Sequence, residues 1–546
     1  MKMYLSLLPV LMLAVSIASA QGTQQDWPSY GGTLNAWRHS ELHQVNVDNV
    51  KQLSVAWAFQ PGDHAEGLQA TPIVRDGVLY LSTSNNLIFA MDAATGAVHW
   101  KYEYNPGEPG VYRRQNRGVA VGHGLVFMGT IDNRVVAVDQ TTGKEVWRVT
   151  VQDPKQCGCN ITGAPLLVKD KVVVGGTGGD LAHRGHLTAF DAKTGDFAWR
   201  FYIIPAPGES GNETWAGDSW KYGGGAPWMT GSFDEQLDLL YWGTGNAAPD
   251  LDGGARLGDN LYTASVVALD PDSGKLVWYY QEVPHDVWDY DAAFEVILAD
   301  LPVKGKMRKL LLHPTKSGYT WVLDRTNGEF VGAWPMVKTD WISGITEDGK
   351  LVGRREPEPG KTLTVCPSVG GGKSWNQSAF SPLTNWIYIP VTRGCSDLFV
   401  RHIEPTPGKG YTGGFWARGS TEPVENYSSL IAFDPLTGKK KWEYPYKYML
   451  VASILSTKGN LLFTGDPEGF FFALDARTGE KLWNFQTGSG HRGSSITYEV
   501  DGRQYIATPS GWGSMVAAGR AAYPKLRGLP SRGAALFVFA LPEAQQ

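Results

Sequence analysis

Charged residues are scarce in this chain, at 19% of 546 residues, and the formal net charge is −5. The basic surface of a nucleic-acid-binding protein is therefore absent, and we expect no nucleic-acid partner. No apolar run reaches the roughly 18 residues of a membrane-spanning helix, so no membrane span is expected. The four cysteines form no C-x-x-C-H motif, which excludes a site for covalently attached haem.

The four cysteines suit an oxidising compartment. Cys366 and Cys395 are predicted to form a structural disulfide. A bond between Cys157 and Cys159 would close a very small, strained ring. Two alternatives therefore stay open for this pair: a labile or functional disulfide, or two thiols that are reduced or separately buried.

Residues 1–20 have the pattern of a secretory signal peptide. Lys2 precedes the apolar run 5–17, and Ala18-Ser19-Ala20 forms a small-x-small cleavage site. Gln21 stands where a lipoprotein would have its cysteine. We therefore expect a soluble exported protein, periplasmic in a bacterium, whose mature chain 21–546 forms one domain.

Glycine (66 residues) and tryptophan (21 residues) are abundant, which favours short strands joined by tight turns over a helical fold. One pattern recurs: an Asp that starts a turn, a Gly four residues later, and a Trp that re-enters the next strand. It predicts a β-hairpin whose Gly takes the left-handed conformation and whose Trp docks against the neighbouring unit. The copies are Asp92/Gly96/Trp100, Asp139/Gly143/Trp147, Asp191/Gly195/Trp199, Asp270/Gly274/Trp278, Asp434/Gly438/Trp442 and Asp475/Gly479/Trp483, with a degenerate copy at Asp324/Gly328/Trp334.

Consecutive copies lie about 40–50 residues apart, the period of propeller blades, with insertions in the longer gaps. Seven hairpins are visible. Trp57 indicates an eighth blade without its own hairpin, and the C-terminal run 534–540 is predicted to complete that blade and close the ring. The sequence therefore predicts an all-β, eight-bladed β-propeller with tryptophan-docking repeats.

Asp289 and Asp291 stand out from the repeat. In an extended segment two residues apart in sequence point to the same side, where their carboxylates would repel unless a cation lies between them. Carboxylate oxygens suit a hard cation such as calcium or an ion of higher charge. The alternative is an ordinary solvated acidic loop at the end of a strand.

Further polar and aromatic residues interrupt the repeat and would converge on the axis of a propeller. Taken singly, Asp180 and Asn246 follow Gly-rich turns where such residues are common, Arg117 and Lys316 could be solvated, and Trp228 could belong to the core. Together they suit a planar polyanionic cofactor that rests on Trp228 and contacts a metal. The set is Glu66, Arg117, Thr162, Asp180, Trp228, Asn246, Lys316 and Asn376.

With these residues in their order and local setting, the mature chain resembles the periplasmic alcohol dehydrogenases that depend on pyrroloquinoline quinone (PQQ). The similarity runs from Trp27-Pro28-Ser29-Tyr30-Gly31-Gly32 to Gly502-Arg503-Gln504-Tyr505-Ile506. It implies that PQQ lies on Trp228, that Lys316 lies beside the quinone oxygens, and that Asp289 is the catalytic base. The implied cofactor-binding residues are Glu66, Arg117, Thr162, Asp180, Trp228, Lys316, Asn376 and Trp512, and the implied metal ligands are Asp180, Asn246, Asp289 and Asp291.

The chain departs from the family pattern in ways that bear on the metal and the substrate. Asp291 matches members that use a lanthanide(III) ion, with calcium as the alternative. Asp180 replaces a glutamate and is one methylene shorter. A tryptophan that covers the substrate in methanol-oxidising members is missing around Val451, which implies a roomier pocket.

A further departure concerns cysteine. Members of the family carry adjacent cysteines that form a ring over the cofactor, and here those positions are Val111 and Tyr112. We expect a Cys157–Cys159 disulfide to replace that cap from a neighbouring blade.

The resemblance implies oxidation of an alcohol to an aldehyde, with electrons passed to a separate c-type cytochrome. Two alternatives remain: the same fold acting with calcium or on a sugar or an aldehyde, and a non-catalytic propeller scaffold. Scaffold proteins with similar blades lack the axial acidic and cationic residues. The oligomeric state stays open, with a homodimer as one alternative.

Overall fold

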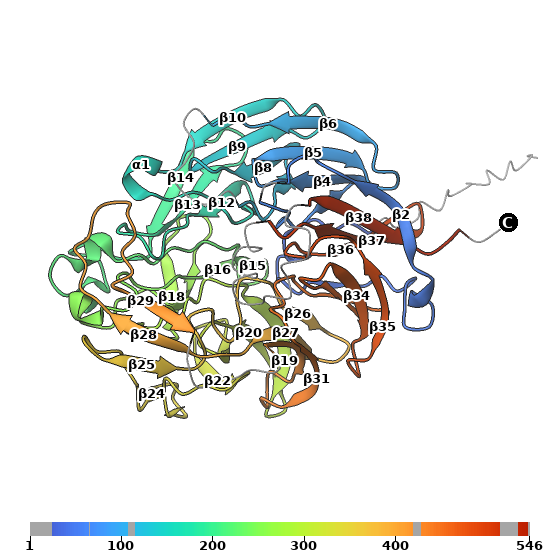
Figure 1. Cartoon of the computed structure of the whole chain (residues 1–546). Helices are drawn as coiled ribbons and strands as arrows, with labels where there is room; N and C mark the ends of the chain where they lie inside the picture. Colours follow the sequence, from blue (N-terminus) through green and yellow to red (C-terminus); the bar gives the residue numbers. More distant parts are fainter. Residues whose placement is uncertain (1–24, 65, 107–114, 419–426, 514–532, 544–546) are drawn as a thin grey trace, which may run out of the picture.

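The computed structural model describes residues 25–64, 66–106, 115–418, 427–513 and 533–543. The expected signal peptide, residues 1–20, lies outside the described residues, as do Val111 and Tyr112. Most strands belong to four-stranded antiparallel sheets, which are arranged around a common centre (Figure 1). No helix within the described ranges has the length and apolar character needed to cross a membrane.

The described strands form eight four-stranded blades, which confirms the predicted propeller. The first three are β3 (Ile73–Arg75), β4 (Val78–Ser82), β5 (Leu87–Asp92) and β6 (Val98–Glu103); β7 (Ala120–Gly122), β8 (Leu125–Gly129), β9 (Arg134–Asp139) and β10 (Glu145–Thr150); and β11 (Leu166–Val168), β12 (Lys171–Gly175), β13 (His186–Asp191) and β14 (Phe197–Tyr202). The fourth and fifth are β15 (Ser232–Asp234), β16 (Leu239–Gly243), β17 (Ser265–Leu269) and β18 (Leu276–Gln281); and β19 (Ile297–Val303), β20 (Lys306–Pro314), β21 (Tyr319–Asp324) and β22 (Phe330–Pro335).

The sixth blade is β26 (Ala379–Ser381), β27 (Trp386–Thr392), β30 (Ser428–Phe433) and β31 (Lys440–Tyr446). The seventh is β32 (Leu455–Thr457), β33 (Leu461–Gly465), β34 (Phe470–Asp475) and β35 (Lys481–Gln486), extended by β1 (His39–Ser40), which pairs with β32 in parallel. The eighth is β36 (Ile496–Val500), β37 (Arg503–Ser510), β38 (Ala535–Ala540) and β2 (Ser54–Phe59). The N-terminal β2 is the outermost strand of this blade, so its pairing with the C-terminal β38 closes the ring as predicted.

The repeat hairpin has a clear local cause, illustrated by the first copy. The Asp92 carboxylate accepts hydrogen bonds from the Ala94 and Thr95 N–H groups, and Gly96 follows with a φ of 76°. A Cβ on Gly96 would lie 2.6 Å from the Trp57 ring of the preceding blade. The glycine therefore gives both the turn and the surface on which the tryptophan docks.

The same docking repeats around the ring, including the degenerate copy. A Cβ on Gly438 would overlap the displaced Trp334, so Trp334 docks although its spacing differs. Trp483 lies beside Phe539 of the closing strand, at 5.2 Å between ring centroids. The other docked pairs are Gly143–Trp100, Gly195–Trp147, Gly274–Trp199, Gly328–Trp278 and Gly479–Trp442.

Insertions occupy the longer gaps of the repeat, as expected. The sixth blade carries the hairpin β23 (Gly344–Ile345) and β24 (Leu351–Val352), and the small sheet β25 (Thr362–Val365), β28 (Ser396–Val400) and β29 (Gly414–Arg418). The Cys366–Cys395 disulfide joins the end of β25 to the start of β28. The remaining short elements are α1 (Pro154–Cys157) and the 3₁₀ helices η1 (Val50–Gln52), η2 (Asn212–Thr214), η3 (Ser219–Tyr222) and η4 (Gly253–Arg256).

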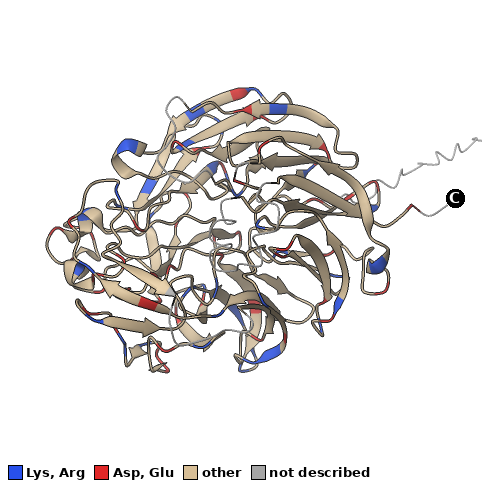
Figure 2. Cartoon of the chain, viewed as in Figure 1, with Lys and Arg blue, Asp and Glu red and all other residues tan. Residues whose placement is uncertain are grey.

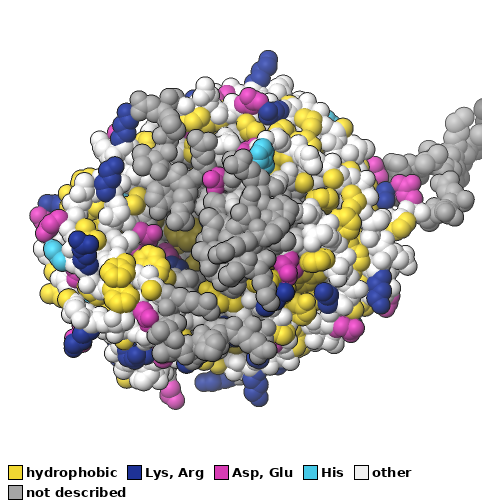
Figure 3. All heavy atoms as spheres, viewed as in Figure 1, with side chains coloured by type: hydrophobic (Ala, Val, Ile, Leu, Met, Phe, Trp, Pro, Cys, Tyr) yellow, Lys and Arg dark blue, Asp and Glu magenta, His cyan; other side chains and the backbone are white. Residues whose placement is uncertain are grey.

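Charge follows the blade architecture. Lys, Arg, Asp and Glu lie mostly on the outer strands and in loops, whereas the inner strands carry few charges (Figure 2). All five residues of β8 are buried, whereas Trp147 is the one fully buried side chain of the outer strand β10. On the face in Figure 3, acidic and basic side chains of the described residues are interspersed.

Candidate active site

A cavity of about 680 Å³ lies where loops from successive blades meet. Each contributing loop joins two blades or the second and third strands of one blade, and strand alternation places these loops at the same end of the ring. The cavity is lined by Glu66, Arg117, Thr162, Asp180, Trp228, Asn246, Asp289, Asp291 and Lys316, all of them predicted site residues. Within the described residues, Asn376 and Trp512 do not line it.

Asn376 and Trp512 lie just behind the wall. The Asn376 side-chain amide donates to the Leu450 and Ala452 carbonyls, at 3.1 and 3.3 Å. Trp512 belongs to the same apolar cluster as Trp228. Both side chains therefore support the cavity wall in the present structure.

One wall of the cavity is cationic and aromatic. The Arg117 guanidinium lies 5.1 Å from the centre of the Trp228 ring and 5.0 Å from that of Trp375. It donates to the Thr162 hydroxyl at 2.6 Å. A second buried guanidinium, Arg492, lies 5.9 Å from the Trp375 ring. This wall offers positive charge beside flat aromatic faces, a combination that suits a planar anion.

A second part of the cavity lining is acidic and is bridged by one ammonium group. Lys316 Nζ lies 2.9 Å from both Asp289 Oδ1 and Asp291 Oδ2. Asp291 Oδ1 also accepts from the Trp228 indole N–H and the Asn246 backbone N–H, at 3.2 Å each. Burial acts to lower the pKa of Lys316, but the two carboxylates outweigh it and raise that pKa. Lys316 therefore stays protonated.

The loop that carries Asp289 is shaped by Asp286. The buried Asp286 carboxylate accepts from the Trp288 N–H at 3.0 Å and from the Tyr290 N–H at 2.9 Å, on either side of Asp289. Asp289 itself has a φ of 62°, a left-handed conformation in which Asp is better tolerated than most residues. The Asp289–Asp291 segment is therefore not extended, because this turn replaces strand geometry, and strand alternation does not apply to it. The two carboxylates converge through Lys316 instead.

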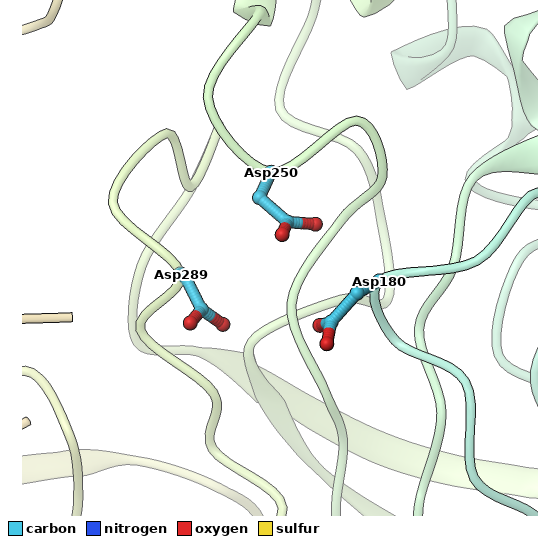
Figure 4. A group of neighbouring side chains, drawn as sticks. All are labelled: Asp180, Asp250 and Asp289. Atoms are coloured by element: carbon cyan, nitrogen blue, oxygen red, sulfur yellow. The ribbon is translucent and has the colours of Figure 1, made fainter. Parts of the chain in front are cut away.

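Three carboxylates gather beside this acidic part of the lining. Ligand oxygens of Asp180, Asp250 and Asp289 all lie within 4.8 Å of one another, and Figure 4 shows the three side chains directed toward a common space. Burial, together with the neighbouring Asp180 and Asp289 carboxylates, raises the pKa of Asp250 well above its usual range. Burial also raises the pKa of Asp289, against the effect of Lys316. Such a cluster needs a cation or protons to balance its charge.

The residues of the site fit the metal ion and the PQQ that the resemblance implies. Asn246 Oδ1 and Asp250 Oδ2 are buried acceptors that lack a hydrogen-bond donor among the described residues. Acceptors in this state beside carboxylates suit a hard metal ion. Arg117, Arg492 and Lys316 could balance the carboxylates of PQQ, and Trp228 offers a flat face for its rings.

Several residues of the site were not predicted from the sequence: Asp250 of the carboxylate cluster, and the lining residues Trp375, Arg492, Phe294 and Met449. Asp250 lies four residues after Asn246, and Trp375 directly precedes Asn376, so proximity to a predicted residue was the available signal. Arg492 follows a His in a Gly-rich segment and had no distinguishing pattern. Phe294 and Met449 are apolar residues whose spacing does not differ from that of core residues.

Cys157 and Cys159 form a disulfide, so the alternative of two separate thiols is wrong. Cys159 Sγ accepts from the Asn133 side-chain amide at 3.2 Å, and both cysteines are buried. Neither cysteine lines the cavity in the described part of the chain. The structure therefore gives the expected capping role no support.

Comparison with known proteins agrees with this arrangement. The family model for PQQ proteins described as "Glucose/ethanol/alcohol dehydrogenase, beta-propeller domain" matches residues 27–341 and 447–506. The chain is 38% identical to the quinoprotein alcohol dehydrogenase PedH of Pseudomonas putida, covering 93% of this chain and 90% of that protein. It is also 38% identical to the quinohemoprotein alcohol dehydrogenase of Comamonas testosteroni, covering 90% and 73%.

A solved structure of a europium-containing methanol dehydrogenase superposes with a TM-score of 0.90 at 34% identity, covering 95% of this chain and 98% of that one. The relative PedH and the solved structure therefore agree over nearly all of the chain, and the family model agrees over residues 27–341 and 447–506. The chain belongs to the family of PQQ-dependent quinoprotein alcohol dehydrogenases.

Proposed function

We propose that this protein oxidises alcohols to aldehydes with Asp289 as the base that takes the hydroxyl proton. The observation that carries the proposal is the meeting of Asp289, Lys316 and the acidic cluster with Arg117 and Trp228 in one cavity. When bound, PQQ supplies the two-electron acceptor, and the metal ion supplies Lewis acidity. The protein's own residues hold the cofactor and the metal ion, orient the alcohol and take its hydroxyl proton.

Cofactor binding is assigned to the aromatic and cationic side of the cavity. Trp228 would carry the ring system, and its indole N–H, held by Asp291, fixes the plane of that platform. Arg117 and Thr162, already joined by a hydrogen bond, would hold carboxylates together with Glu66. Lys316 would lie beside the quinone oxygens, and Asn376 and Trp512 would support the wall from behind.

Asp289 is suited to proton abstraction by its position. It faces the cavity, and its Oδ1 lies 2.9 Å from the Lys316 ammonium. A cation at the Asp180, Asn246 and Asp289 ligands would favour the ionised carboxylate by direct attraction. Lys316 then limits how far the proton-accepting oxygen can move, because the same ammonium also pairs with Asp291.

The metal ligands are assigned to Asp180, Asn246, Asp289 and Asp291. A site with several carboxylates favours lanthanide(III) over calcium, because the attraction between the carboxylates and the bound ion grows with the charge of the ion. The substrate is assigned as an alcohol larger than methanol. Val451 and Met449 line the cavity where a large aromatic cover would narrow it.

The cellular setting completes the proposal. Residues 1–20 would direct export and be removed, leaving 21–546 as one periplasmic domain. Electrons would pass to a separate c-type cytochrome. The N-terminal sequence of protein purified from a periplasmic extract tests the export step, and Met1 at the mature N-terminus would contradict it.

Turnover of metal-free protein reconstituted with PQQ and either Ca²⁺ or a light lanthanide tests the function. Activity is followed with an artificial electron acceptor across primary and secondary alcohols. Asp289→Asn is expected to abolish turnover while PQQ absorbance shows the cofactor still bound, because the variant keeps the shape of the side chain and loses the base. Retained turnover in Asp289→Asn would refute the assignment of the base, and failure of wild-type protein to take up PQQ would refute the function.

A further inference from the structure

Asp250 was not among the predicted site residues, yet its carboxylate is completely buried beside the proposed metal ligands. It comes from the loop between β16 and β17, whereas Asp180 and Asp289 come from loops on either side, between β12 and β13 and between β18 and β19. The three side chains point toward one another from these separate segments (Figure 4). Three separate loops, one in the third blade, one in the fourth and one that connects the fourth to the fifth, therefore each direct one carboxylate at the same point.

The hydrogen bonds of Asp250 leave one of its oxygens available. Oδ1 accepts from the Asn246 side-chain amide at 2.9 Å, and buried Oδ2 has no donor among the described residues. A buried acceptor in this state is costly unless an ion or a proton satisfies it. The site itself has to supply the partner.

The same hydrogen bond orients Asn246. Because the amide nitrogen donates to Asp250, the amide oxygen is turned away from it and toward Gly179, where a Cβ would lie only 2.3 Å from Oδ1. Asn246 Oδ1 is also buried without a donor among the described residues. Two unsatisfied acceptors from one loop thus accompany the Asp180 and Asp289 carboxylates.

The nearby cations are directed elsewhere. Lys316 bridges Asp289 and Asp291. The buried Arg256 guanidinium donates to the Pro249, Asp250 and Asp286 carbonyls and to the Asn260 side chain, so its contact with Asp250 is to the backbone. Neither cation occupies the space between Asp180, Asp250 and Asp289.

We propose that Asp250 is a direct ligand of the metal ion of this centre, in addition to the four residues assigned above. Asp180 is one methylene shorter than the glutamate of the family pattern. Asp250 supplies a further carboxylate whose oxygen lies within 4.8 Å of the oxygens of Asp180 and Asp289. The inference rests on the proposed function for the presence of a metal ion. It adds a fourth carboxylate to those of Asp180, Asp289 and Asp291, and the additional negative charge favours a trivalent ion over a divalent one.

Terbium(III) luminescence tests the ligand directly, with Trp228 as a neighbouring antenna. Full-length protein is stripped of metal and titrated with Tb³⁺, with and without PQQ. Asp250→Asn, which keeps the size of the side chain, is expected to lower Tb³⁺ affinity about tenfold or more. In Asp250→Ala, which removes both side-chain oxygens, luminescence lifetimes in H₂O and D₂O should show about one additional coordinated water, because solvent replaces a lost protein ligand.

Asp252→Asn is the matched control. Asp252 lies two residues further along the same loop, is buried, and pairs with His402 at 3.0 Å rather than with the cluster. This variant should keep wild-type Tb³⁺ affinity and hydration. Unchanged affinity in Asp250→Asn together with unchanged hydration in Asp250→Ala, or no Tb³⁺ binding by the wild-type protein, would overturn the proposal.

The outcomes separate this inference from the proposed function. If wild-type protein binds Tb³⁺ through Asp250 but takes up no PQQ, the metal ligand stands and the enzymatic proposal falls. If the reconstituted enzyme oxidises alcohols while Asp250→Asn keeps its Tb³⁺ affinity and Asp250→Ala keeps its hydration, the activity stands and the inference about Asp250 falls.

Discussion

Gly179 is the residue through which the geometry of the metal centre can be tested with one added methyl group. Its Cα faces the Asn246 side chain so closely that a Cβ would lie 2.3 Å from Asn246 Oδ1. Ordinary contacts to a methyl carbon begin about 1 Å further out, so in Gly179→Ala the amide oxygen has to move by about that distance. Gly179 lacks a positive φ, so contact rather than backbone strain dominates the effect.

The size of the expected loss in Tb³⁺ affinity follows from the narrow range of metal–oxygen distances. Metal–oxygen distances are held within about 0.2 Å, so a displacement of about 1 Å removes Asn246 as a ligand. The expected loss in Tb³⁺ affinity is about 10- to 100-fold, which corresponds to about 1.4–2.8 kcal/mol. The movement also disturbs the 2.9 Å hydrogen bond from Asn246 to Asp250, so the effects of Gly179→Ala and Asp250→Asn should be less than additive.

The assay is the Tb³⁺ titration described for Asp250. Gly410→Ala is the matched control, because Gly410 pairs with Leu181 next to Asp180, lacks a positive φ, and has open space where the Cβ would be. It should bind Tb³⁺ as the wild-type protein does. Equal affinity of Gly179→Ala and Gly410→Ala would refute the assignment of Asn246 Oδ1 as a ligand.

Two further predictions concern ion selectivity and ring closure. Asp291→Ala should weaken Tb³⁺ binding more than Ca²⁺ binding, because a lost negative charge costs a trivalent ion more; parallel titrations check this, and equal losses would contradict it. Phe539→Ala should destabilise the protein by about 3–5 kcal/mol, because Phe539 of β38 is fully buried against Trp483 and Phe485. Urea unfolding measures the change, and exposed Phe197→Ala should leave the midpoint nearly unchanged.

The blades were predictable because each repeat contains its own local evidence. Each copy has an Asp that caps the turn, a Gly that provides the left-handed residue, and a Trp that packs on the Gly of the next blade. These residues are close in sequence, so a recognised copy indicates where the next copy should be found. Even the displaced Trp334 docks on Gly438, since the neighbouring blade offers the same surface. The pairing of β2 with β38 followed from the same pattern, because the eighth blade needed an outer strand.

The centre was only partly predictable because loops, not repeats, determine it. Asp289 and Asp291 were predicted to flank a metal cation, and that part stays a prediction. In the structure both carboxylates pair with the Lys316 ammonium, and their relation is set by the Asp286 turn and not by strand alternation. Asp250 joins the cluster through a loop that folds back between two strands of its blade. A short motif cannot reveal such a residue, because its partners come from other blades.

Charge balance links these loops to one another. Asp180, Asp250, Asp289 and Asp291 bring four carboxylates into a buried region, and Lys316 is the ammonium that pairs with two of them. If all four were ionised, three negative charges would remain in excess, which is the charge that one trivalent ion neutralises. Burial raises the pKa values of Asp250 and Asp289, which favours their protonated forms when no cation lies between them. A bound metal ion favours the ionised carboxylates instead, so ion affinity and protonation of these carboxylates are one coupled equilibrium.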